Sequence, residues 1–163
     1  MQALSGHSTL NGMAQRDPIR VFVTHAWENS DDYLRVFEYL ESARNFYYRN
    51  CSGPEHRPVD TSVEGFREEL RRQIAAAEVV VALSNLYAAH RDLMVFQLNY
   101  AKASDKPVVL LPGFGRDLVL PREVTSLADE QAGWEERGLV DALRRQARHE
   151  ETARWDTIEF KLD

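Results

Sequence analysis

Polar side chains follow two apolar stretches of the chain, and their types and positions suit the binding of a small polar ligand. The apolar run at residues 78–83 ends in Ser84 and Asn85, and Tyr87 comes two residues later. An earlier stretch at residues 19–24 leads into His25. Hydroxyl, amide and imidazole groups can hydrogen-bond a ribose or an amide, and an imidazole can also transfer a proton near neutral pH.

The run at residues 78–83 predicts a central parallel strand. It is apolar at each position from 79 to 83, whereas a strand with one face in water alternates apolar and polar residues. A short segment of buried helix has the same composition, and that alternative stays open. Ligands of open parallel sheets bind beyond the carboxyl ends of the strands, so the residues after position 83 are the first candidates.

Each other candidate has a structural alternative. His25 is expected to contact a ligand or act as an acid or base, or else to order its loop through backbone contacts. Trp27 can stack on a ligand ring or close the base of the core. Glu28 can supply a carboxylate or simply begin a helix, and Asn85 can bind a ligand or shape a turn. The amide of Gln97 can bind a hydroxyl group but carries no charge.

Strand and helix patterns alternate along the chain, which predicts a three-layer α/β domain. Ser30, followed by Asp31 and Asp32, has the pattern of a helix start. Thr61 and Glu64 have the spacing of a capping box. The expected strands are 19–24, 46–49, 78–83, 107–112 and an edge strand at 131–133; the expected helices are about 31–40, 61–77, 93–104 and 136–148, with a polar turn at 87–92. Right-handed crossovers favour a mostly parallel five-stranded sheet in the order 2-1-3-4-5, with strands 1 and 3 sharing one cleft.

Composition restricts the class of protein. The 163 residues carry a net charge of −6, and Arg71 and Arg72 lie at helical spacing from Glu68 and Glu69, so nucleic acid is not the expected partner. Neither a membrane span nor a signal peptide is evident, and the single cysteine cannot form an internal disulfide, so we expect a cytoplasmic protein. We expect one domain at 18–150, between a lead-in at 1–17 and a tail at 151–163.

Common catalytic and cofactor motifs are missing. Gly113–Phe114–Gly115 lacks the third glycine of a dinucleotide fingerprint, and the chain has no Walker or GxSxG motif. The five histidines have no metal-ligand spacing, so no metal site is expected. The bulky segment His25–Ala26–Trp27–Glu28 occupies the position of a flavodoxin phosphate loop, so no tightly bound flavin is expected.

Several short motifs, in this order, resemble the TIR-like domains of prokaryotic antiviral defence, of the ThsB kind found in Thoeris systems. The resemblance spans about residues 18–148 and rests on Phe22–Trp27 (family F-I-S-H-S-W), Asp31–Asp32–Tyr33 (D-D-Y), Asn50, Ser52, Pro54 and Pro58 (N-x-S-x-P-x-x-x-P), Leu83–Tyr87 (L-S-x-x-Y), Lys106–Pro107–Val108 (K-P-V), and Ala128–Asp129 with Gly133–Trp134 (A-D-x-x-x-G-W).

The resemblance implies a TIR-like, flavodoxin-like fold and an immune-signalling function. Relatives use NAD, breaking its nicotinamide–ribose bond to release ADP-ribose-type signals that activate a partner effector, and TIR domains assemble into oligomers. On this basis Gln97, Tyr87 and His25 are the candidate catalytic residues. The candidate ligand contacts are Thr24, Trp27, Ser84, Asn85, Asn50 and Ser52.

The chain departs from the family at the reacting centre. TIR enzymes carry a Glu on the third helix within S-x-W-x-x-x-E, where this chain has Arg91, Leu93 and Gln97. Loss of a preorganised charge of this kind raises a barrier by about 3 kcal/mol or more. Two hypotheses therefore stand: NAD cleavage, with a carboxylate from Glu28 or a neighbouring subunit, and a catalytically degenerate adaptor that acts with a partner effector.

Overall fold

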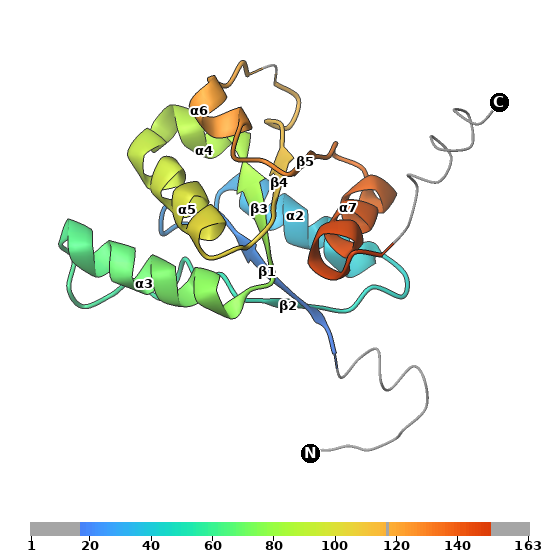
Figure 1. Ribbon diagram of the computed structural model, residues 1–163, viewed down its shortest axis with the longest axis horizontal. Coiled ribbons are helices and arrows are strands. Elements are labelled where there is room, and N and C mark those ends of the chain that lie inside the picture. The colour runs from blue at the N-terminus through green and yellow to red at the C-terminus, as the bar shows by residue number, and fades with distance from the viewer. Residues whose placement is uncertain (1–16, 117, 151–163) are drawn as a thin grey trace.

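Five parallel strands form a single sheet in the order β2-β1-β3-β4-β5, as predicted (Figure 1). The computed structural model describes residues 17–116 and 118–150. The strands are β1 (Ile19–Val23), β2 (Tyr48–Asn50), β3 (Val79–Leu83), β4 (Val108–Leu111) and β5 (Glu130–Gln131). The predicted tail at 151–163 and residues 1–16 of the predicted lead-in lie outside the described residues.

Helices cover both faces of the sheet and complete three layers (Figure 1). Helices α2 (Asp31–Ser42) and α7 (Glu136–Arg148) pack on one face, and α3 (Val63–Ala76) and α5 (Arg91–Ala103) pack on the other. The two short helices are α4 (Ser84–Ala89) and α6 (Arg122–Thr125). The predicted three-layer α/β class, with flavodoxin-like strand order, is confirmed. Across residues 17–116 and 118–150, no helix combines the length and apolar character needed to cross a bilayer.

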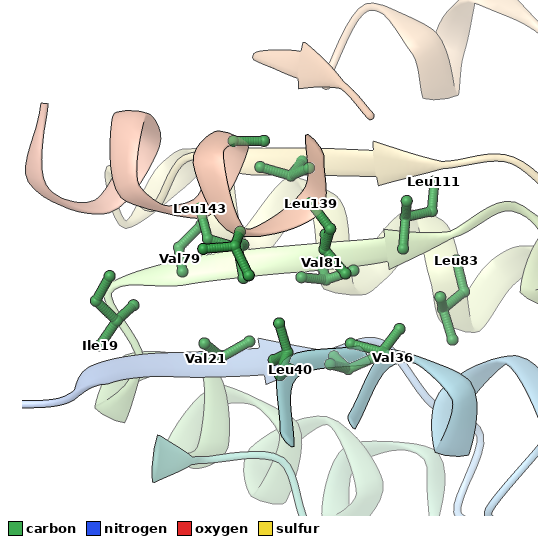
Figure 2. Close-up of a cluster of buried hydrophobic side chains, with 14 of the residues drawn as sticks. Ile19, Val21, Val36, Leu40, Val79, Val81, Leu83, Leu111, Leu139 and Leu143 are labelled. Carbon is green, nitrogen blue, oxygen red and sulfur yellow. The ribbon is translucent and has the colours of Figure 1, made fainter. Parts of the chain in front are cut away.

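The two central strands supply the middle of the core. Every residue of β3 and β4 is buried, because helices cover the strands on both sides. Figure 2 shows Val79 and Val81 of β3 packed with Leu139 and Leu143 of α7, and the alternate residue Val80 contributes to the cluster on the opposite face. The uninterrupted apolar run therefore indicated a strand, not a helix.

The start of α3 lies one residue later than predicted. Ser62, not Thr61, caps the helix, since its Oγ accepts a hydrogen bond from the Gly65 nitrogen at 3.1 Å. A Cβ on Gly65 would lie 2.1 Å from the Asp60 oxygen, so the chain can enter the helix on this path only with glycine there. Glu64 instead pairs with Arg71 at 2.8 Å.

The segment predicted as a polar turn at 87–92 is mostly helical. Helix α4 begins directly at the end of β3, and only His90 separates it from α5. This segment contains neither glycine nor proline, and its two alanines favour helix.

Two strand boundaries also differ from the prediction. β2 starts at Tyr48, with Phe46 buried in the core, and β5 lies at Glu130–Gln131. The helix capped by Ser30 and the helix at 136–148 are confirmed.

Removing a core side chain from α7 tests this packing. Leu143 is fully buried, so Leu143→Ala is expected to lower the free energy of unfolding by about 3 kcal/mol through lost apolar burial and a residual cavity. Leu34, also on a helix but 46% exposed, is the control, and Leu34→Ala should change stability by less than about 0.5 kcal/mol. Urea unfolding followed by circular dichroism measures both, and equal effects would contradict the packing described for α7.

Candidate functional site

A pocket of about 140 Å³ lies where β1 and β3 end side by side. It is lined by residues from both strand ends, the loop after β1, and helix α4 with the residue that follows it: Thr24, His25, Ala26, Glu28, Ser30, Leu83, Asn85, Leu86, Ala89 and His90. Of the residues singled out from sequence, Thr24, His25, Glu28 and Asn85 therefore line the pocket. The predicted meeting of the two polar strand ends is confirmed.

His25 orders the loop that follows β1. Its side chain is almost completely buried, and its Nδ1 accepts a hydrogen bond from the Trp27 nitrogen at 3.1 Å. Its Nε2 must then carry the proton and donate to Oε1 of Gln73 at 2.9 Å. Burial lowers the pKa of His25, although the Gln73 hydrogen bond opposes this shift. With both ring nitrogens occupied, His25 matches the loop-ordering alternative.

The side chain of Gln97 holds the backbone of the same loop. The side chain is fully buried, and its Oε1 accepts from the His25 nitrogen at 3.1 Å while its Nε2 donates to the His25 oxygen at 2.9 Å. The Nε2 group also donates to the Leu93 oxygen at 3.1 Å. A carboxylate cannot donate, so these contacts require an amide and account physically for glutamine here. Gln97 does not line the pocket, and its catalytic role stays a prediction without a contact to support it.

Gln73, which sequence reasoning missed, joins this loop to the segment after β2. Its Oε1 also accepts from the Gly53 nitrogen at 2.9 Å, and its Nε2 donates to the Gly53 oxygen at 3.2 Å. The sequence did contain a signal for its burial. Gln73 lies three residues after Leu70 and one before Ile74, on the buried side of α3.

Asn50 and Ser52 form a second polar cluster at the end of β2. Asn50 Nδ2 donates to the Tyr33 hydroxyl at 3.0 Å, and Asn50 Oδ1 accepts from the Ser52 nitrogen at 2.9 Å. The hydroxyls of Tyr33 and Ser52 are 3.1 Å apart. Neither Asn50 nor Ser52 lines the pocket, so their predicted ligand contacts stay predictions, and their observed contacts fix the turn after β2.

Hydroxyl groups join neighbouring strand ends. Thr24 Oγ1 accepts from the Leu83 nitrogen at 3.0 Å, which ties β1 to β3 beneath the pocket. Ser84 Oγ donates to the Leu111 oxygen at 2.6 Å, which ties β3 to β4. Ser84 is therefore directed away from the pocket, toward β4.

Asn85 is the polar residue of α4 that lines the pocket. Its Nδ2 donates to the buried carboxylate of Asp32, which also accepts from the Phe114 nitrogen at 3.3 Å and pairs with Arg35 at 2.9 Å. Its Oδ1 is buried without a hydrogen-bond partner among the described residues. That oxygen lies against Gly113, where an added Cβ would be 2.5 Å away, so neighbouring protein atoms cover it.

Tyr87 and Trp27 lie outside the pocket lining. The Tyr87 hydroxyl accepts from Arg91 at 3.2 Å and donates to Glu123 at 3.3 Å, near the surface. Trp27 has a left-handed backbone, with φ of 66°, and its ring packs against His25 and Phe66. Trp27 therefore packs against neighbouring side chains, and ligand contacts by either residue stay predictions.

Glu28 and His90 face each other across the pocket lining. Glu28 Oε2 lies 3.8 Å from His90 Nε2, and both side chains are exposed, Glu28 by 68% and His90 by 42%. His90 escaped sequence reasoning because it fell within the supposed polar turn, and the sequence contains no pattern that pairs it with Glu28. The carboxylate at this strand end therefore comes from the loop after β1.

Comparisons with known proteins do not assign the chain. No model of a known protein family matches it, and the search of curated proteins found no significant match. Within residues 17–116 and 118–150, no group of three or more His, Cys, Asp or Glu side chains is arranged to hold a metal ion.

Replacing the buried amide of Gln97 with the TIR-type carboxylate tests its structural role. We expect Gln97→Glu to lower the free energy of unfolding by about 3 kcal/mol at neutral pH, because a buried charge would face two carbonyl oxygens. The loss should shrink as the pH falls and the carboxyl becomes a donor. Gln131→Glu, at an exposed position, is the control. Denaturant titrations at several pH values measure the effect, and a stable, pH-independent Gln97→Glu protein would refute this role.

The lowered pKa of His25 predicts a pH dependence of stability. The folded protein binds this proton less readily than the unfolded chain, whose histidine pKa is about 6.5. The contribution of His25 is therefore present above that value and is lost as the pH falls below it. Between about pH 7 and pH 5, His25→Gln should lose less stability than the unmodified protein. His149→Gln, at an exposed histidine, should retain the original slope.

Proposed function

We propose that the protein is a TIR-like signalling domain that binds NAD or a related nucleotide at the β1–β3 pocket and cleaves its nicotinamide–ribose bond. The observation that carries the proposal is the presence of Glu28 in the lining of a pocket at the strand ends. The motifs from Phe22 to Trp134 support the family assignment, and strand order 2-1-3-4-5 is compatible with it. In such a site the released ADP-ribose-type product would serve as the signal to an effector.

The pocket offers the groups that this chemistry needs. When the nicotinamide leaves with the electron pair of the C–N bond, positive charge develops on the ribose, and a water molecule then bonds to that carbon and loses a proton to solvent, which gives ADP-ribose. The carboxylate of Glu28 would stabilise that charge, because Glu28 lines the pocket that would hold the ribose. The imidazole of His90, 3.8 Å from Glu28, would position the carboxylate.

A non-catalytic adaptor is the second candidate, and the contacts of Gln97 favour it. The third helix carries an amide committed to backbone hydrogen bonds at the position where TIR enzymes place their carboxylate. If Glu28 does not replace that charge, the pocket binds a nucleotide without cleaving it. Nucleotide binding would then regulate contact with an effector or with other TIR-like subunits.

Nicotinamide release distinguishes the two candidates. Purified protein is incubated with NAD, and free nicotinamide is measured by chromatography. We expect Glu28→Gln to reduce release by about a hundredfold, because the carboxylate that would face the developing positive charge is replaced by a neutral amide. The control is Glu38→Gln, which changes an exposed glutamate on α2 that does not line the pocket.

Each result decides between the candidates. Release that depends on Glu28 supports the enzyme. Absence of release with a thermal shift on adding NAD supports the adaptor, and release unaffected by Glu28→Gln would exclude Glu28 as the catalytic carboxylate. Absence of both release and thermal shift would reject the nucleotide site.

A further inference from the structure

A second hollow adjoins the pocket. It has a volume of about 650 Å³ and lies between the first turns of α3 and α5, two helices that pack side by side on one face of the sheet (Figure 1). Ala89 and His90 line both hollows, so they meet at the junction of α4 and α5. We call the larger one the α3–α5 groove.

The pocket alone is too small for a dinucleotide. Its volume of about 140 Å³ is below the range of roughly 300–1,000 Å³ typical of sites that enclose a whole small-molecule ligand. A ring or a ribose fits a space of that size, and the rest of a nucleotide would have to lie outside it. The groove is the neighbouring hollow that shares its rim.

Arg67 gives the groove an available positive group. Its guanidinium lies 5.0 Å from the centre of the Phe96 ring, and it forms no hydrogen bond or ion pair with any other described residue. A guanidinium held over a ring keeps its N–H donors directed outward, in the fork that matches a phosphate. By contrast, the other arginine of the groove, Arg91, is paired with Glu123 and Asp92.

The remaining wall of the groove is apolar. Val63, Phe66, Leu93 and Phe96 line it, and Val63 is 68% exposed. Asp92 is the acidic residue of the lining, and its carboxylate is paired with Arg91 at 3.2 Å. The groove thus combines four apolar side chains, which can contact a base, with one unpaired cation, suited to a phosphate.

We infer that the α3–α5 groove binds the diphosphate and second nucleoside of a dinucleotide whose reacting ribose occupies the pocket, with Arg67 as the phosphate contact. This inference rests on the proposed nucleotide-binding function and specifies its ligand class. A ligand crossing from pocket to groove passes Ala89 and His90, which line both. The site therefore selects dinucleotides over nucleosides.

Calorimetric binding of two probes tests the inference. Nicotinamide riboside would contact the pocket only, whereas NAD would contact both the pocket and the groove. We expect Arg67→Gln to weaken NAD binding about tenfold, the change expected for one lost charge-assisted contact, and to leave riboside binding unchanged. Arg49→Gln is the matched control, because Arg49 is exposed on β2, lines neither hollow and makes no ion pair with another described residue.

The two proposals fail in different ways. If the unmodified protein binds NAD and the riboside equally and Arg67→Gln changes neither, the groove inference is wrong and the pocket function stands. If neither probe binds, the nucleotide function is wrong and the inference falls with it. An equal loss of both probes in Arg67→Gln would place Arg67 in general support of the fold and would also overturn the inference.

Discussion

Two buried amides determine the path of the chain where β1 ends. Gln97 binds the nitrogen and the oxygen of His25, and Gln73 binds the His25 ring and both backbone groups of Gly53. An unsatisfied buried polar group costs about 1–3 kcal/mol, so alternative loop paths that leave these amides unpaired are strongly disfavoured. The loop is thereby fixed relative to α3, α5 and the segment after β2. The position of His25, and through its ring the backbone of Trp27, depends on this network.

The central part of the fold could be predicted because its environment imposes a strict pattern. β3 and β4 are covered by helices on both faces, so apolar side chains occupy every position. The edge strands β2 and β5 pair on one side only and are three and two residues long, which leaves little pattern to recognise. Helix α4, with six residues, is too short for a periodic signal, and its omission turned a helix into a supposed turn.

Sequence reasoning named Thr24, His25, Glu28 and Asn85 of the pocket lining but missed His90. Strand order brought the ends of β1 and β3 together, as expected from the topology. The direction in which a side chain points depends on its position around the helix axis. The sequence did not reveal that position for α4, and His90 at the end of α4 was therefore not identified. Gln97 was predicted to be catalytic, although Met94, Leu98 and Ala101 are buried on the same stripe of α5 and place Gln97 in the interior.

The same constraint connects Gln97 with the carboxylate found in the pocket. An amide at position 97 can both donate and accept, and it uses both abilities to hold the loop after β1. That loop carries Glu28 to the lining of the pocket, opposite His90. A carboxylate at position 97 would lose the donor and release the loop that places Glu28. In the proposed function, therefore, Gln97 on α5 and Glu28 on the loop act together, because Gln97 holds the loop that carries Glu28.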